Sequence, residues 1–338
     1  MSSQNKVTVA LDAHGTDHHT QVIVDGAISA IEKLECNVIL VGDKKEIEEC
    51  LGDRGWVEGL SHEQASEIIE MSEEPATAVR KKTDSSIVVG ARIVKEGKAD
   101  AVVSAGNTGA MMAAALLTLG RIKGVARPGI TVELPAPGSG TGAQTRQVLL
   151  DAGATVDTEP EWMVQHALMA KAYVEHRLGV ENPSIGLLSN GEESSKGDSL
   201  RKETHELLKN VEGFIGNCEG RDLTSGYPTI VVTDGFTGNV ALKTIEGVFK
   251  SLSSMVMEAL SKEEIIEASA EVIPHILEAA HAVHPDTYGG AVLLGITSPV
   301  VISHGSANSD AIYNAVRVAV ECVETNVVQA VTEAIENS

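Results

Sequence analysis

Three turns of the chain carry small polar residues of the kind that hold an anion. They are residues 104–109 (Ser-Ala-Gly-Asn-Thr-Gly), 234–239 (Asp-Gly-Phe-Thr-Gly-Asn) and 303–306 (Ser-His-Gly-Ser), and each follows a short apolar segment. The glycines remove side-chain bulk, and the helix expected after each turn directs unpaired backbone N–H groups at it. We therefore expect the three turns to form one shared crevice that binds a phosphate-sized anion.

A fourth polar turn, residues 190–197, carries a single lysine, Lys196, and directly follows the apolar segment Ile185–Leu188. An ammonium group there could neutralise a phosphate. A surface lysine in a loop is the ordinary interpretation of such a residue. The functional interpretation is favoured because ligands of α/β sheets bind outside the carboxyl ends of the strands.

The only dense basic run in this acidic chain is Arg80-Lys81-Lys82. Adjacent charges usually form a solvated face. The same run is also the best candidate for attracting a phosphate or an acidic partner protein, and the sequence favours neither interpretation over the other.

A cluster of metal-ligand residue types, Asp12, His14, Asp17, His18 and His19, follows the first apolar segment. These types suit zinc or iron, but no second cluster such as HExxH is present, and turns at strand ends are often rich in Asp and His. We predict no metal, and leave open whether His14, His18 and His19 bind one.

Several other chemistries lack their motifs. The chain has no GxSxG elbow, and none of its four cysteines (Cys36, Cys50, Cys218 and Cys322) has a histidine close by in sequence that would activate it. It also lacks GxxxxGK[ST], and no GxGxxG follows the first strand, so neither a P-loop nor a dinucleotide site is indicated. Covalent catalysis and nucleotide cofactors are therefore not expected.

The composition predicts a globular protein. The chain has 338 residues, 43% of them hydrophobic, and its formal net charge of −22 argues against nucleic acid as a partner. The widely spaced cysteines fit reduced thiols in the cytoplasm, and we see no secretory or membrane-spanning segment. No linker interrupts the chain, so we expect a single catalytic domain over residues 1–338.

Short β-branched segments alternate with helix-length periodic ones, which predicts a mainly parallel sheet covered by helices. The expected strands are Val7–Leu11, Val38–Val41, Ala101–Ser104, Gly129–Leu134, Ile185–Leu188, Phe214–Gly216, Ile230–Thr233 and the segment beginning at Val300. One helix is expected from about Ser86 to Gly97 and another from Ala110 to Leu119.

A helical hairpin is expected at about residues 245–285, where apolar residues follow helical spacing on both sides of a break near Ser261. Pro274 is expected to kink or divide its second arm. The hairpin either packs on the core or projects, in which case it serves a dimer or touches lipid.

Motifs from one end of the chain to the other resemble those of the bacterial phosphate acyltransferase family of phospholipid synthesis. They are Asp12-Ala13-x-Gly15, Glu74 to Lys82, Ser104 to Gly109, Glu193 to Gly197, Asp234 to Asn239, Tyr288-Gly289-Gly290 and His304-Gly305-Ser306. The resemblance implies an α/β/α fold of three layers, similar to that of isocitrate and isopropylmalate dehydrogenases. It also implies transfer of a fatty acyl group from acyl carrier protein to inorganic phosphate, with no nucleotide or metal cofactor.

By the same resemblance, Lys196 and Asn239 are the expected catalytic residues. Lys196 would hold phosphate, and Asn239 would donate a hydrogen bond to phosphate or to the developing oxyanion. The expected phosphate- and substrate-binding residues are Asp12, Gly15, Arg80, Ser104, Gly106, Asn107, Thr108, Gly109, Asp234, Gly238, His304, Gly305 and Ser306.

The chain departs from the family pattern in three places. His14-Gly15-Thr16-Asp17 replaces the usual Met-Gly-Gly-Asp, and residues 135–142 lengthen a connection. The hairpin is acidic, with Glu258, Glu263, Glu264, Glu267 and Glu271, where the family is usually apolar and basic. Since anionic lipid repels these carboxylates, we expect a cytoplasmic homodimer with at most weak peripheral membrane contact.

Two alternative functions remain open from the sequence. One is a phosphotransacetylase-like enzyme that uses an acyl-coenzyme A thioester. The other is a non-catalytic scaffold or metal-binding relative, suggested by the histidine cluster and the acidic surface.

Overall fold

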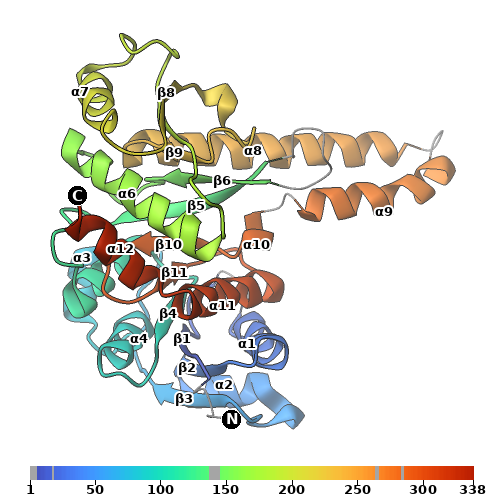
Figure 1. The fold of residues 1–338 in the computed structure, drawn as a ribbon. Helices are drawn as coiled ribbons and strands as arrows, with labels where there is room; N and C mark the ends of the chain where they lie inside the picture. Colours follow the sequence, from blue (N-terminus) through green and yellow to red (C-terminus); the bar gives the residue numbers. More distant parts are fainter. Residues whose placement is uncertain (1–5, 17–18, 137–144, 263–265, 283–284) are drawn as a thin grey trace, which may run out of the picture.

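A single sheet of eleven strands runs through the part of the chain that the computed structural model describes, which is residues 6–16, 19–136, 145–262, 266–282 and 285–338 (Figure 1). The strand order is β3-β2-β1-β4-β11-β10-β5-β6-β9-β7-β8. The strands are β1 (Thr8–Asp12), β2 (Asn37–Gly42), β3 (Leu60–Gln64), β4 (Ala101–Ser104), β5 (Gly129–Ala136), β6 (Thr145–Leu150), β7 (Ile185–Leu188), β8 (Phe214–Cys218), β9 (Ile230–Val232), β10 (Ala291–Leu294) and β11 (Val300–Ile302).

The sheet is mainly parallel, as predicted, but its strands form two groups that run in opposite directions. Strands β3, β2, β1, β4 and β11 are parallel to one another, and so are β6, β9, β7 and β8. Strands β10 and β5 join the groups through three antiparallel pairings. The strands that carry the turns of residues 104–109 and 303–306 therefore run opposite to the strand that carries residues 234–239.

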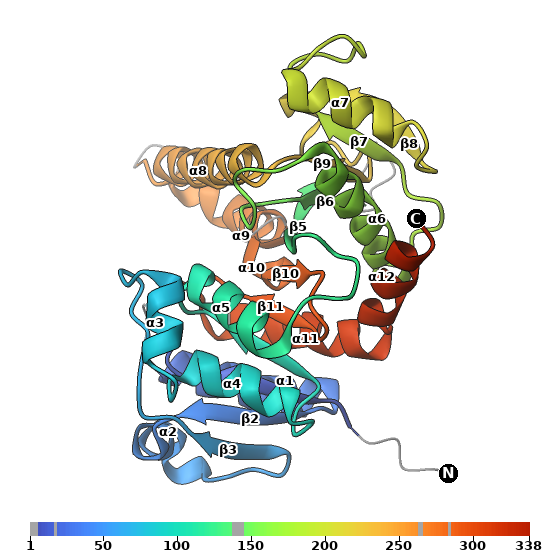
Figure 2. The same cartoon turned by 90° about the vertical axis from the view of Figure 1, so that its left-hand side faces the viewer.

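Two layers of helices cover the sheet (Figures 1 and 2). One face packs against α1 (Gln21–Leu34), α2 (Lys44–Leu51), α6 (Pro160–Arg177), α7 (Ser199–Leu208), α11 (Ser309–Glu324) and α12 (Val327–Glu336). The other packs against α3 (Pro75–Lys81), α4 (Ser86–Lys95), α5 (Thr108–Ala114) and the first half of α8 (Gly235–Leu260). The three-layer arrangement is thus confirmed. The single-domain boundary remains a prediction.

Most expected elements are present, with ends that differ by a few residues. Helix α4 was expected, and α5 begins two residues early and continues into a π-helical turn at Ala115–Leu119. Short 3₁₀ turns at Gly52–Arg54 and Gly220–Asp222 complete the description. The sequence did not predict β3, β6 or β10. Strand β3 buries only Leu60, so it lacks the alternating apolar pattern of a half-buried strand.

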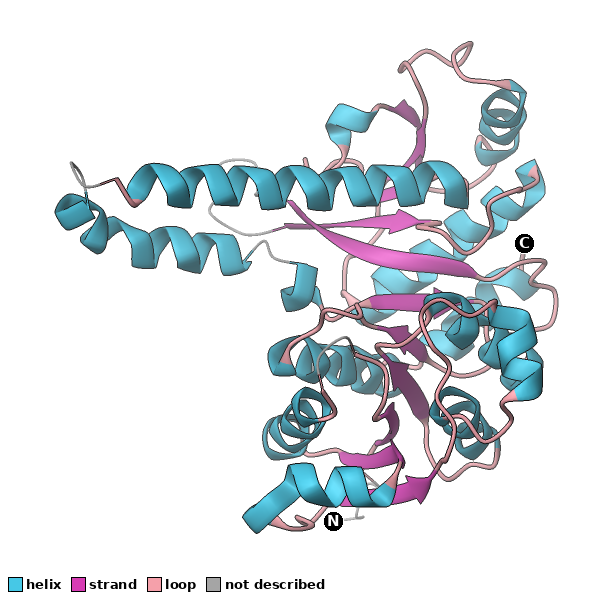
Figure 3. Ribbon diagram, turned by 180° about the vertical axis from the view of Figure 1, so that it is seen from behind, coloured by secondary structure: helices cyan, strands magenta, loops and turns pink. Residues whose placement is uncertain are grey.

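The helical hairpin is present, and it projects. Helices α8 and α9 (Ile266–Ala282) extend side by side beyond the sheet (Figure 3), and α10 (Pro285–Tyr288) leads back to β10. Helix α9 continues across Pro274, so the proline does not divide it. Among the described residues, no helix is both long enough and apolar enough to cross a membrane.

Candidate active site

The first turn, residues 104–109, is tied to the end of β1 by a buried hydroxyl. Ser104 Oγ donates to Asp12 Oδ2 at 2.7 Å and accepts from the Gly106 N–H at 3.0 Å. The other Asp12 oxygen accepts from the His14 N–H. Gly15 lies against this turn, since a Cβ on it would come within 2.5 Å of the Gly106 nitrogen. Asp12 and Gly15 therefore support the turn from behind, and a direct contact with substrate remains a prediction for them.

Asn107 uses its side chain to hold neighbouring backbone. Its Oδ1 caps α5 by accepting from the Ala110 N–H at 3.0 Å, and its amide donates to the carbonyls of Glu70, Met71 and Glu73. Gly109 packs against Pro75 at the start of α3. Of this turn, the exposed Thr108 side chain is the one that reaches the cavity described below.

The third turn, residues 303–306, is fastened to the first, because the Ser303 N–H donates to the Ser104 carbonyl at 2.9 Å. His304 is exposed, and its Nδ1 lies 2.7 Å from Ser306 Oγ and accepts from the Ser306 N–H at 3.2 Å. In the neutral ring the proton is consequently on Nε2. His304 can therefore present an N–H donor.

The second turn is held by a nearly buried arginine, Arg201, that the sequence did not single out. Asp234 caps α8 by accepting from the Thr237 N–H at 2.9 Å, and its other oxygen pairs with Arg201 Nη2. The same Nη2 donates to Thr237 Oγ1 at 2.9 Å. Burial raises the pKa of Asp234, but the bonds from Thr237 and Arg201 outweigh it and hold the pKa below its usual value.

Asn239 is positioned by close packing at the start of α8. A Cβ on Gly238 would overlap the carbonyl oxygen of Asp151, so only glycine permits this approach. Asp151 in turn accepts four backbone N–H bonds at 2.7–3.0 Å, from Ile130, Gly153, Ala154 and Thr155. Gly153 lies directly against Asn239. Asp234 and Gly238 thus build the turn, and their contact with phosphate remains a prediction.

Lys196 lies in an exposed loop beside the second turn. Within the described residues its ammonium group makes no ion pair. The loop is closed by the bond from the Gly197 N–H to Asn190 Oδ1 at 2.9 Å, with Gly197 at a φ of +93°. Arg201 packs against Gly197 and, through Asp234, joins this loop to the start of α8.

One cavity of about 210 Å³ is lined by residues of all three turns: Thr108, Asn239, Ser303 and His304. The shared crevice is therefore present, but for a different reason from the one expected. The strands do not end at a common edge; instead the crevice lies between two oppositely directed groups of strands, over β5 and β10. Lys196 is not part of the cavity lining.

Arg80 and the histidine cluster lie elsewhere. Arg80 is exposed near the end of α3. His14 Nε2 lies 3.2 Å from Glu46 Oε2, and no group of three or more His, Cys, Asp or Glu side chains is placed to hold a metal among the described residues. Asp17, His18 and residues 137–144 of the lengthened connection lie outside the described residues.

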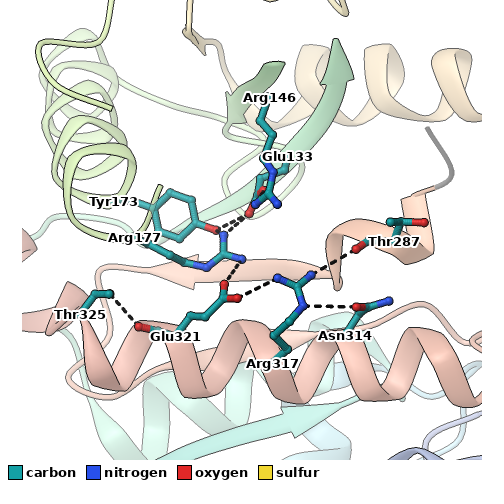
Figure 4. A network of polar contacts seen from close by, with 9 residues as sticks. All are labelled: Glu133, Arg146, Tyr173, Arg177, Thr287, Asn314, Arg317, Glu321 and Thr325. Carbon is teal, nitrogen blue, oxygen red and sulfur yellow. Dashed lines mark hydrogen bonds and ion pairs between the residues drawn. The ribbon is translucent and has the colours of Figure 1, made fainter. Parts of the chain in front are cut away.

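A network of charges centred on Glu133, which lines the cavity, joins β5 to α6 and α11 (Figure 4). The buried carboxylate of Glu133 accepts from Tyr173 at 2.8 Å, from Arg146 at 2.9 Å and from Arg177. Burial disfavours the charge of Arg177, but the Tyr173 and Glu133 oxygens outweigh this and raise its pKa. The Arg146 guanidinium also covers the ring of Tyr288, a cavity residue, at 5.7 Å. The network therefore braces one wall of the cavity.

The buried thiols are not poised as nucleophiles. Burial raises the pKa of Cys36 to about 11 and those of Cys218 and Cys322 to about 12. Since the thiolate is the reactive form, these three cysteines are inert near neutral pH.

The chain has the isocitrate dehydrogenase-like fold. A phosphotransacetylase from Streptococcus pyogenes superposes with a TM-score of 0.60 at 16% identity, covering 98% of this chain and 94% of that one. A 4-hydroxythreonine-4-phosphate dehydrogenase from Klebsiella pneumoniae gives a TM-score of 0.53 at 12% identity, covering 94% and 100%. At these identities the likeness concerns the fold alone.

The family model described as "Fatty acid synthesis protein" matches residues 7–330. The phosphate acyltransferase of Desulfitobacterium hafniense strain Y51 is 46% identical over 326 residues, covering 96% of both chains. That of Bacillus subtilis strain 168 is 42% identical over 332 residues, covering 97% of this chain and 98% of the relative. The chain therefore belongs to the phosphate acyltransferase family of fatty acid synthesis proteins, and it is an enzyme.

Proposed function

We propose that the protein transfers a fatty acyl group from acyl carrier protein to inorganic phosphate, giving acyl phosphate for phospholipid synthesis. The observation that carries this proposal is the single cavity in which three polar turns meet an apolar lining. Such a site suits a reaction between an anion and an apolar thioester.

The proposed reaction needs no nucleophile from the protein, because a phosphate oxygen attacks the thioester carbon itself. The new C–O bond sends an electron pair to the carbonyl oxygen, and collapse of the tetrahedral oxyanion breaks the C–S bond. The carrier leaves as a thiolate, which takes up a proton to become the thiol. The enzyme must then align the two substrates and stabilise the oxyanion.

The polar residues have roles that fit these tasks. The ammonium group of Lys196 would neutralise phosphate. The amide of Asn239 lies in the cavity lining and would donate to phosphate or to the oxyanion. His304 can donate through Nε2 from the facing turn. Thr108 adds a hydroxyl at the start of α5.

The basic end of α3 is the proposed docking point for the carrier. Arg80 and Lys81 are both exposed, and α3 begins against Gly109, next to the cavity residue Thr108. An acidic carrier protein would be attracted to this pair, which stands out in a chain whose net charge is −22.

We also propose a homodimer in the cytoplasm, formed through the projecting hairpin. Val248, Leu252 and Met255 of α8 and Leu277 of α9 are each at least half exposed. An apolar face of this kind fits a second copy of the chain better than an anionic membrane, given the acidic residues around it. Light scattering after size-exclusion chromatography tests this.

The activity itself is tested by incubating the purified protein with acyl carrier thioester and phosphate. We expect free thiol and a product that hydroxylamine traps; no release would reject the proposal. Replacing the carrier with coenzyme A tests the phosphotransacetylase alternative. Lys196→Ala and Asn239→Ala are each expected to lower kcat/KM by about 10²–10³. Lys202→Ala, which removes an exposed lysine of α7, is the control and should leave the rate unchanged.

A further inference from the structure

The cavity has an apolar floor formed by one face of the sheet. Side chains alternate along a strand, so Ile130, Val132 and Leu134 of β5 point to the same face. The floor continues onto the neighbouring strands through Ala291 of β10 and Ile302 of β11, which pair with each other. All five of these side chains line the cavity.

One wall of the cavity is a stripe along α8. Asn239, Leu242, Ile245 and Phe249 line it, and their spacing of three or four residues places them on one face of the helix. From Asn239 to Phe249 the helix rises about 15 Å, at about 1.5 Å per residue. The cavity is therefore an elongated trough with the proposed reaction centre at one end of its α8 wall.

The cavity is partly open to solvent, and most of its lining is apolar. The charged exceptions are Glu133 and the α8 residues Lys243 and Glu246, which pair with each other at 2.8 Å. For scale, an apolar cavity of about 150 Å³ binds benzene, and this one measures about 210 Å³. A mostly apolar space of this size fits an apolar ligand.

We propose that this trough is the subsite for the hydrocarbon chain of the acyl donor, with the thioester carbon at Asn239 and the tail directed along α8 toward Phe249. The proposal rests on the proposed function and adds to it a determinant of chain length. A methylene group advances an extended chain by roughly 1.25 Å, from a C–C bond of about 1.5 Å and an angle of about 111°. The α8 wall therefore accommodates about twelve carbons.

The chain-length dependence follows from this geometry. Each buried methylene is worth about 0.8 kcal/mol, or roughly fourfold, so kcat/KM should rise about fourfold per methylene and level off near twelve carbons. Longer tails leave the trough and gain nothing.

Val132→Phe tests the floor. Ile130 lies at the Asn239 end, since its N–H bonds to Asp151, and Val132 is two residues or about 7 Å further along β5. An added ring there should leave four-carbon donors within threefold of wild type and slow twelve-carbon donors at least thirtyfold. Val180→Phe, at an exposed valine after α6, is the matched control and should keep the wild-type profile. A second variant serves if Val132→Phe does not fold. Ile245→Ala enlarges the trough and should raise the rate with branched donors relative to the rate with straight-chain donors.

A binding experiment separates this proposal from the proposed function. Straight-chain alkylphosphonates of four, eight and twelve carbons are titrated into the protein by calorimetry, with no carrier present. We expect affinity to rise with length in wild type and to stop rising early in Val132→Phe. Such binding without any turnover would support the trough and reject the proposed reaction. If wild type, Val132→Phe and Ile245→Ala all turn over with the same dependence of rate on acyl-chain length, the proposed acyl-chain subsite is rejected and the proposed reaction stands.

Discussion

Arg201 joins the Lys196 loop to the start of α8 through its ion pair with Asp234, and its replacement gives the most demanding prediction. Arg201 is 11% exposed and Asp234 is 7% exposed at their side chains, so the pair is nearly buried. Replacing Arg201 with Met keeps much of the side-chain volume and leaves the Asp234 carboxylate with the bonds of Thr237 alone. Removal of one partner of a buried pair costs about 3–5 kcal/mol.

The expected loss of unfolding free energy is at the lower end of that range, about 3 kcal/mol, because Asp234 keeps its cap bond and the favourable end of the helix dipole. The effect on the reaction is expected to be larger. Arg201 holds the loop of Lys196 against the turn of Asn239, and a displacement of about 1 Å at a reacting group can cost about 10²-fold in rate. We expect Arg201→Met to raise the KM for phosphate and to lower kcat/KM about 10²-fold.

The assay is thiol release from the acyl carrier thioester, with phosphate varied, at a temperature where circular dichroism shows every variant to be folded. Arg201→Lys keeps the charge but cannot bridge Asp234, Thr237 and Asp198 together, so it should recover only part of the loss. The control is Arg54→Met, which breaks an exposed pair with Asp25 and should change stability by no more than about 1 kcal/mol. A folded Arg201→Met with wild-type kcat and wild-type KM for phosphate would refute the reasoning.

Three further predictions concern the surrounding structure. Gly238→Ala should lower the unfolding free energy by about 1–3 kcal/mol through overpacking and abolish activity. Gly247→Ala, at a position open to solvent on the same helix, should raise the unfolding free energy by about 0.5–1 kcal/mol. Denaturation curves of the two variants measure both changes. Arg177→Met leaves Glu133 buried without its principal partner and should lower the unfolding free energy by about 3–5 kcal/mol in urea titration, and an unchanged value would contradict the network. Because folding lowers the pKa of Asp234, its charge stabilises the folded state above about pH 4, and this contribution is lost as the pH falls through the folded-state pKa. The difference in unfolding free energy between wild type and Asp234→Asn should therefore be constant from pH 5 to 8 and shrink below pH 4. A difference that grows in acid would contradict the lowered pKa.

The sequence by itself determined the class of fold and the polar turns. Alternating β-branched and periodic segments predicted the layers, because strand and helix bury their apolar faces with periods of 2 and 3.6 residues. Turns built from Ser104 to Gly109 and from Asp234 to Asn239 were visible because their residue types are uncommon in strands and helices. The helical hairpin was predictable because its apolar residues recur with the helical period of 3.6 residues.

Only the tertiary structure decided how those parts meet. The reversal of direction between β11 and β6 depends on the pairing of β10 with β5, which are more than a hundred residues apart, so the crevice could be anticipated but not its cause. Asp151 and Arg201 carry no local signal, because a carboxylate and a guanidinium look alike in sequence whether they are solvated or buried against partners. The trough along α8 is a property of the space between two elements, and such space exists only after they have packed.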